Sequence, residues 1–438
     1  MTASATRARP PATSGQAPGR GTVVHHLKFR SGRSGSLRLR QLALVEIAAA
    51  LLLAAWVISP VALVPAGAVA AVLVLLAAVR LRGRSLPELL AAAWALRARR
   101  RRAAATPVPT GTEPGLAPAV ECDPSLRTYT YSRGKDQDRR PIGMIGDGSF
   151  LTVVLQVESD ATALRAERTR QPLPVGLVRD TLEVDGIHLE SAQVVLHTQP
   201  APALHLPQQS VAVSNYAPLQ AQTGAPAVRI TWIALKLDPE RCPEAVAARG
   251  GGLVGAQKCA VRSADHLASR LTGAGFRATL LTEDELTAAV ATSACANPLA
   301  MAQAGQAGQA GQTGSPERRT EESQRSWRCD NRRHTTYWVR RWPQLSGPGG
   351  GPSLPQLVSL LTAVPTLATT FSLTLARDEQ QAVSVRGHMR VTGRSDAELV
   401  AARRALEGAA RHSGTGLLRL DREQLPAMLA TLPLGGTR

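Results

Sequence analysis

Six residues, Gly250 to Gly255, form the segment that most resembles a phosphate-binding loop. Such a loop reads G-x-x-x-x-G-K followed by Ser or Thr, because its backbone amides and its lysine surround the phosphates. Here Ala256 follows the last glycine, and Lys258 precedes a cysteine. The segment also lies after the expected start of a helix, and no G-x-G-x-x-G pattern follows a strand. The sequence therefore favours a flexible break in or before a helix over a nucleotide site.

Asp136 and Asp138 form the second motif that could do chemistry, an Asp-x-Asp pair of the kind that holds a divalent metal and a nucleotide sugar. In such a pair the two carboxylates should end a strand, so that both converge on one ion. Here they lie in the polar stretch SRGKDQDRR, between a lysine and two arginines. This context predicts a solvated, charged turn rather than a metal site.

Histidines and serines offer no further catalytic arrangement. His188, His197 and His205 alternate with apolar residues, but their spacings of nine and eight suit no local metal site. His334 follows two arginines, which disfavour a protonated or metal-bound imidazole. The nucleophile motif G-x-S-x-G is absent. We therefore predict no catalytic, cofactor-binding or metal-binding residues, no cofactor, and a chain that is not an enzyme.

The cysteines indicate a reducing compartment for the soluble part of the chain. They are odd in number, widely scattered and without a C-x-x-C pair or zinc spacing, which predicts five free thiols. They are Cys122, Cys242, Cys259, Cys295 and Cys329.

The net charge of +18 is concentrated at one end of the chain. Residues 1–102 hold 16 Lys and Arg against 2 acids, and they also contain the longest apolar run. Aromatic residues make up 3% of the chain, too few for a stacking platform that binds single-stranded nucleic acid. The pattern is typical of a membrane protein and predicts no nucleic-acid partner.

The apolar run predicts a transmembrane hairpin over residues 37–84, with spans at 42–59 and 61–79 separated at Ser59-Pro60. Basic residues flank both ends, so two spans with both termini cytoplasmic in a multi-pass arrangement satisfy the positive-inside rule. Glu46 is the one ionisable residue within the spans, and its place near the cytoplasmic end favours an interfacial acid over a functional carboxylate.

Composition divides the rest of the chain. Residues 1–36 are basic and are expected to be disordered, and residues 103–120 are expected to form a linker. Residues 85–102 end in an arginine-rich run that predicts a juxtamembrane helix along anionic membrane lipids. A basic run of this kind can also contact nucleic acid, but its position beside the apolar segments favours lipid.

Residues 121–438 are expected to form a cytosolic α/β domain. The order strand, helix, strand over 228–282 suggests a βαβ unit or at least an α/β layer. The AGQ repeat within 296–316 predicts a low-complexity insertion that forms a dispensable loop. Further strands are expected at 149–158, 191–198, 366–376 and 382–392, and further helices at 354–363 and 395–411.

Three phrases make the chain resemble the EccE family, a membrane component of actinobacterial type VII (ESX) secretion systems. They are TWIALKLDPERCPEAVAARGGG at 231–252, HTTYWVRRWP at 334–343 and GTGLLRLDREQLPAMLATLPLGG at 414–436. The order of a basic start, two apolar segments, an arginine-rich segment and one large domain is also similar. The AGQ repeat departs from the usual compact domain of the family.

The resemblance implies a structural or assembly subunit of the secretion membrane complex, beside EccB, EccD and the ATPase EccC. It also implies a cytosolic domain like a degenerate glycosyltransferase, for which the family offers no catalytic motif to carry over. Two alternatives stay open at this point. One is a membrane-anchored glycosyltransferase-like enzyme, and the other is a membrane-tethered adaptor of different machinery.

Overall fold

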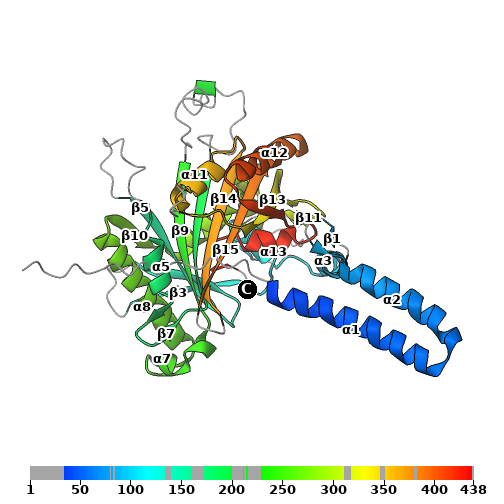
Figure 1. Ribbon diagram of the computed structural model, residues 1–438. Helices are drawn as coiled ribbons and strands as arrows, with labels where there is room; N and C mark the ends of the chain where they lie inside the picture. Colours follow the sequence, from blue (N-terminus) through cyan, green and yellow to red (C-terminus); the bar gives the residue numbers. More distant parts are fainter. Residues whose placement is uncertain are drawn as a thin grey trace, which may run out of the picture.

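The computed structural model describes residues 34–78, 80–81, 84–109, 111–133, 140–159, 172–199, 211, 214–215, 228–309, 317–345, 351–378 and 382–436. Figure 1 shows a pair of helices in blue that projects from a domain built on one large sheet. The segment 1–36, which is expected to be disordered, lies outside the described residues except for 34–36. Asp136, Asp138 and His205 also lie outside them.

The projecting pair consists of α1 (Ser34–Ile58) and α2 (Leu63–Ala78), joined by the short 3-10 helix η1 (Pro60–Ala62). Proline has no amide hydrogen and starts η1, while the Ser59 hydroxyl accepts a hydrogen bond from the amide of Ala62 at 3.3 Å. Small side chains allow the two helices to approach closely, and the buried ones are Ala48, Ala55, Ala66 and Ala70.

The prediction that this pair crosses a membrane is wrong. None of the helices in the described part of the chain combines the length and the apolar character that a membrane crossing requires. The 16 residues of α2 extend only about 24 Å, and the uncharged part of α1 after Glu46 only about 18 Å, against about 30 Å of hydrocarbon. The predicted second span, 61–79, includes Val61 and Ala62, which belong to η1 and not to α2.

The domain contains one sheet whose strands, in spatial order, are β11, β12, β13, β15, β14, β8, β9, β5, β4 and β3. Two more strands join it, β10 beside β5 and β16 beside β13, and every pairing among the described strands of this sheet is antiparallel. The strands are β3 (Arg127–Tyr131), β4 (Ile142–Gly146), β5 (Leu151–Ser159), β8 (Ser191–Gln199), β9 (Val228–Leu237), β10 (Phe276–Leu280), β11 (Thr320–Glu322), β12 (Trp327–Cys329), β13 (Arg332–Arg341), β14 (Ala368–Arg377), β15 (Val383–Gly393) and β16 (Gly416–Arg419).

The helices of the domain are α3 (Leu86–Ala105), α4 (Ala117–Val120), α5 (Val175–Asp180), α7 (Pro243–Ala247), α8 (Gly252–Gly273), α9 (Glu283–Ser293), α10 (Pro298–Gln309), α11 (Leu354–Thr362), α12 (Asp396–His412) and α13 (Gln424–Leu429). The 3-10 helix η2 (Pro239–Arg241) and two short strand pairs, β1 (Arg80–Leu81) with β2 (Arg84–Ser85) and β6 (Glu183–Val184) with β7 (Ile187–His188), complete the described elements. The loop expected over the AGQ repeat is helical from Pro298 to Gln309.

The expected fold class is corrected by the strand order. The strands β9 and β10 that flank α8 run parallel to one another, but β5 lies between them and is antiparallel to both. The unit is therefore a split βαβ, which has the same element order in the sequence as a plain βαβ. A doubly wound nucleotide-binding sheet would be parallel, so the large antiparallel sheet does not fit the glycosyltransferase-like fold.

Two copies of one topology make up the sheet. The first copy is β5-α5-β8-β9-α8-β10, with its strands in the spatial order β10, β5, β9, β8. The second is β13-α11-β14-β15-α12-β16, with its strands in the corresponding order β16, β13, β15, β14. Each is the β-α-β-β-α-β arrangement of ferredoxin-like domains. Each is also preceded by two antiparallel strands, β3 and β4 or β11 and β12.

The register of the two copies agrees residue by residue. The amide that follows β10, that of Leu281, donates to the carbonyl of Val154, and the amide that follows β16, that of Leu420, donates to the carbonyl of Thr336. Val154 and Thr336 are therefore equivalent positions. The cross-strand pairs that lead from Val154 through β9 to β8, and from Thr336 through β15 to β14, make Val195 equivalent to Ser372. These two residues pair with each other. The two copies are therefore related by an approximate two-fold axis through that pair.

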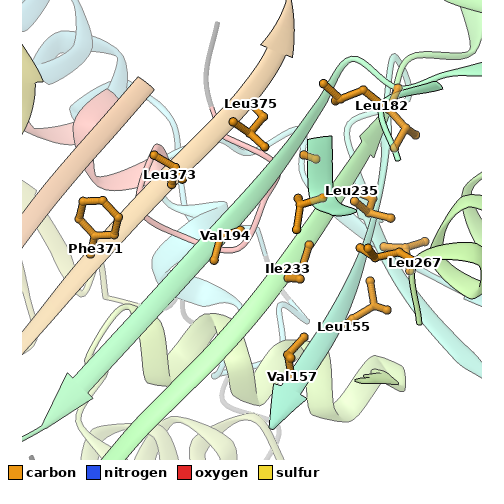
Figure 2. Packing of buried hydrophobic residues seen from close by; sticks show 14 of the residues in the cluster. Leu155, Val157, Leu182, Val194, Ile233, Leu235, Leu267, Phe371, Leu373 and Leu375 are labelled. Carbon is orange, nitrogen blue, oxygen red and sulfur yellow. The ribbon is translucent and has the colours of Figure 1, made fainter. Parts of the chain in front are cut away.

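One face of the sheet packs under α5, α8, α11 and α12, and its apolar side chains form one continuous core. Figure 2 shows this continuity, since Val194 of β8 lies between Ile233 of β9 and Leu373 of β14. The opposite face packs under α4, α9 and α13 in a second cluster that includes Trp232, Trp327 and Met428. The sheet is thus covered on both faces.

Two terminal arms cross between the copies: residues 290–297, which comprise the last turn of α9 and the segment after it, and residues 429–436, which begin at the last residue of α13. The first arm meets the second copy, where the Ser293 carbonyl accepts a hydrogen bond from Arg390. The second arm meets the first copy, where Thr152 donates to the carbonyl of Leu434 at 3.1 Å and Gln193 donates to the carbonyl of Ala430 at 2.9 Å. Each copy is therefore held by the arm of the other.

Candidate functional site

The helix pair α1–α2 carries most of the large apolar side chains that the described residues expose. Trp56 is 69% exposed, Val57 84% and Val64 77%. Contiguous exposed apolar surface on this scale marks an interaction site, because an isolated soluble protein gains nothing by leaving it in water. The exposed side chains of the pair are Leu42, Val45, Ile47, Leu52, Leu53, Trp56, Val57, Ile58, Val61, Val64, Val69, Val72, Val74 and Leu75.

Helix α3 connects this apolar pair to the edge of the sheet at β11, beside which it lies in Figure 1. Arg99 holds the Glu322 carboxylate with two hydrogen bonds of 2.8 and 2.9 Å and also donates to the carbonyl of Arg422 at 2.7 Å. Arg100 donates to the backbone carbonyl of Glu322 at 3.0 Å. Because the Glu322 side chain is only 4% exposed, this two-bond pair is strong and fixes α3 in one position.

Replacing Glu322 by glutamine should release α3 from the domain. The change leaves Arg99 partly buried without its carboxylate, and removal of one partner from such a pair costs about 3–5 kcal/mol. Trypsin, which cleaves after arginine, should then cut within residues 97–102 at least about tenfold faster. Peptide mass spectrometry gives the rate. The control is E321Q on the same strand, whose carboxylate is 65% exposed and pairs with Arg328. Equal cleavage rates in both variants would show that the ion pair does not hold α3.

A fully buried guanidinium, that of Arg390, lies on the second face of the sheet. It donates to the Thr370 hydroxyl at 2.9 Å and to the carbonyl of Ser293, and it contacts the Met428 sulfur. No carboxylate of the described residues pairs with it, and burial lowers the pKa of Arg390 to about 10. The equivalent position in the first copy is Ala234, so this cation is a feature of the second copy alone.

Two of the four histidines singled out from the sequence lie beside this guanidinium. The His197 Nδ1 atom shares a hydrogen bond of 3.0 Å with the Thr370 hydroxyl, and the His334 Nδ1 atom shares one of 3.0 Å with the Thr392 hydroxyl. Burial, and then the charge of Arg390, lower the pKa of His197 to about 3 and hold the pKa of His334 well below its ordinary value. Both rings are therefore neutral near pH 7, which suits a structural role better than proton transfer.

The remaining candidates do not join this cluster. His188 lies exposed on β7, and Gly250 and Gly251 precede α8, which starts at Gly252 with φ values above zero at all three glycines. A side chain at Gly255 would collide with the carbonyl of Val246. The first three glycines thus allow the chain to enter α8, and Gly255 allows α8 to pack closely against the carbonyl of Val246. No three His, Cys, Asp or Glu side chains within the described ranges lie close enough to hold a metal ion.

The five cysteines are unpaired, as the sequence predicts. Burial raises the pKa of the Cys122, Cys295 and Cys329 thiols, which keeps them protonated and unreactive.

Comparison with known protein families matches the middle of the chain. Residues 225–339, which run from the start of β9 into β13 and include Glu322, match the family described as "EccE: Putative type VII ESX secretion system translocon, EccE". No curated protein matches the chain. The resemblance drawn from the sequence is therefore confirmed over residues 225–339, and the chain carries an EccE-family segment that points to involvement in a type VII secretion system.

Proposed function

We propose that this protein is a non-enzymatic assembly subunit of a type VII secretion membrane complex, with EccB, EccC and EccD as partners. The match of residues 225–339 to the EccE family carries the proposal. The exposed apolar pair α1–α2 supports it, because a subunit of a larger assembly needs a surface of this kind. We propose anionic lipids of the cytoplasmic membrane that holds this complex as the second class of partner.

The architecture suits a rigid connector. The sheet is packed on both faces, and the crossed arms join its two copies into one body. The ion pair of Arg99 with Glu322 then ties that body to α3 and hence to the apolar pair. A partner bound to α1–α2 would thus hold the whole sheet at a defined distance and orientation.

Co-purification tests this role. The tagged chain, expressed with EccB, EccC and EccD and extracted in mild detergent, should elute with them as one complex in size-exclusion chromatography. The combined variant L53S, W56S, V57S and V64S removes four exposed apolar side chains and should elute separately. E244S, a change at an exposed site on α7, should leave the complex intact. Elution of the unmodified chain apart from all three partners would contradict the proposal.

A non-enzymatic role also predicts weak binding of nucleotide sugars. Calorimetry of the purified chain with UDP-glucose and Mn²⁺ should show no saturable binding below about millimolar, which corresponds to only about 4 kcal/mol. Micromolar binding would instead support the glycosyltransferase-like alternative. Loss of that binding in D136N or D138N would place the ligand at the Asp-x-Asp pair.

A further inference from the structure

Helix α3 has two faces with different tasks. Ala92 and Leu96 are buried, and Arg99 docks on Glu322 from the same side of the helix. At 3.6 residues per turn these three residues lie within about 60° of one another around the helix axis. They define the docked face of α3, which faces the rest of the protein.

The outward face of α3 consists of Leu90, Trp94, Arg97 and Arg101. At about 100° per residue, these four lie within about 50° of the direction opposite to the docked face. Leu90 is 52% and Trp94 is 69% exposed, and both arginines are exposed. The one acidic residue of α3, Glu88, does not belong to this face. The outward face therefore combines two large apolar side chains with two cations.

We infer that the outward face of α3 binds an anionic lipid surface and thereby sets the β11 edge of the sheet against the membrane. Trp and Leu beside Arg on one helix face are typical of helices that lie in the headgroup region, where the apolar side chains enter the acyl boundary and the cations meet phosphates. The inference rests on the proposed function, since a subunit of a membrane complex meets such a surface.

The position of α3 supports a lipid surface over other polyanions. Helix α2 contacts α3, so the outward face lies on an element adjacent to the exposed apolar surface of α1–α2. Nucleic acid offers no partner for an apolar surface of that extent, whereas a bilayer meets both the apolar and the cationic side chains. Because Arg99 and Arg100 bond to the domain, only part of the arginine run meets the lipid.

Vesicle binding by the full chain tests the inference. The purified protein is mixed with vesicles of phosphatidylcholine alone or of phosphatidylcholine with phosphatidylglycerol, and the bound fraction is measured by flotation. The ratio of the two partition coefficients isolates the contribution of charge from that of the apolar pair. Each arginine near an anionic surface contributes about 1 kcal/mol, so R97S with R101S should lower this ratio about 30-fold.

The matched control is R404S with R411S, which removes two exposed arginines from α12 and leaves the ratio unchanged. High salt should lower the ratio of the unmodified chain toward that of the α3 variant. An unchanged ratio in R97S with R101S would overturn the inference. So would binding of a single-stranded oligonucleotide that the same variant loses while vesicle binding persists. Neither result bears on co-purification with EccB, EccC and EccD, which tests the proposed function separately.

Discussion

Lowering the pH from about 7.5 to about 5.5 should destabilise the folded domain by about 4 kcal/mol through His197, His334 and His388, all of which have a lowered pKa. The unfolded chain takes up a proton at each histidine near pH 6.5, whereas the folded chain holds the pKa of His197 at about 3 and that of His334 well below 6.5. Acid therefore favours the unfolded state. The loss begins below about pH 6.5 and amounts to about 1.4 kcal/mol per histidine for each further pH unit, until the folded pKa is reached.

Urea titrations followed by tryptophan fluorescence at the two pH values measure this loss. Carboxyls whose pKa is lowered in the folded protein, such as Glu283 and Glu285, lose their contribution only below about pH 4.5 and stay outside this window. The triple variant H197Q, H334Q and H388Q should lose most of the pH dependence, because burial also lowers the pKa of His388 to about 4. The variant H412Q, at an exposed histidine, should keep it. An unmodified chain that is equally stable at both pH values would contradict the burial of these rings.

Replacing Arg390 by alanine should destabilise the domain by about 3–5 kcal/mol. The change opens a cavity at a side chain that is fully buried, and it leaves the carbonyl of Ser293 without its donor. Because Ser293 belongs to the arm that crosses from the first copy, the contact between the two copies weakens as well. Chemical denaturation at neutral pH measures the loss.

The variant R390M separates packing from charge. Methionine fills most of the same volume and removes a buried cation that has no carboxylate, so its cost should stay below about 1.5 kcal/mol. A cost for R390M as large as that for R390A would show that the hydrogen bonds of the guanidinium, and not its volume, stabilise the arm.

Hydrophobic periodicity predicts most strands and helices well, because each face of the sheet buries alternate residues. The expected strand at 382–392 is β15, and the expected helix at 395–411 is α12. The order of the strands could not be predicted. A split βαβ and a plain βαβ have the same sequence of elements, and the choice depends on where the distant strand β5 pairs.

The buried polar cluster could not be predicted for a related reason. In β15 the polar residues His388, Arg390 and Thr392 alternate with apolar ones, a pattern that normally indicates a solvent face. Helices α9 and α13 and their arms cover that face, and they come from both copies. The sequence carries a weak trace of the duplication, since LTAAVATSAC at 286–295 and LPAMLATLPL at 425–434 share four of ten residues.

The predicted spans are longer than the apolar parts of the helices, because hydropathy alone does not show where a helix begins and ends. The run from 61 to 79 is apolar throughout, but its first residues belong to η1 and α2 ends at Ala78. Such a run cannot be read as a full membrane span without knowing its helical part.

The central claim, that the chain is a structural subunit of a type VII secretion complex, is tested most directly by the mass of that complex in cells with and without the chain. Native electrophoresis of membrane extracts, probed for EccB, EccC and EccD, should show a smaller complex when the chain is deleted, together with loss of type VII secretion. Return of the unmodified chain should restore both, and the variant L53S, W56S, V57S and V64S should restore neither. A complex of unchanged mass that secretes normally without the chain would contradict the account.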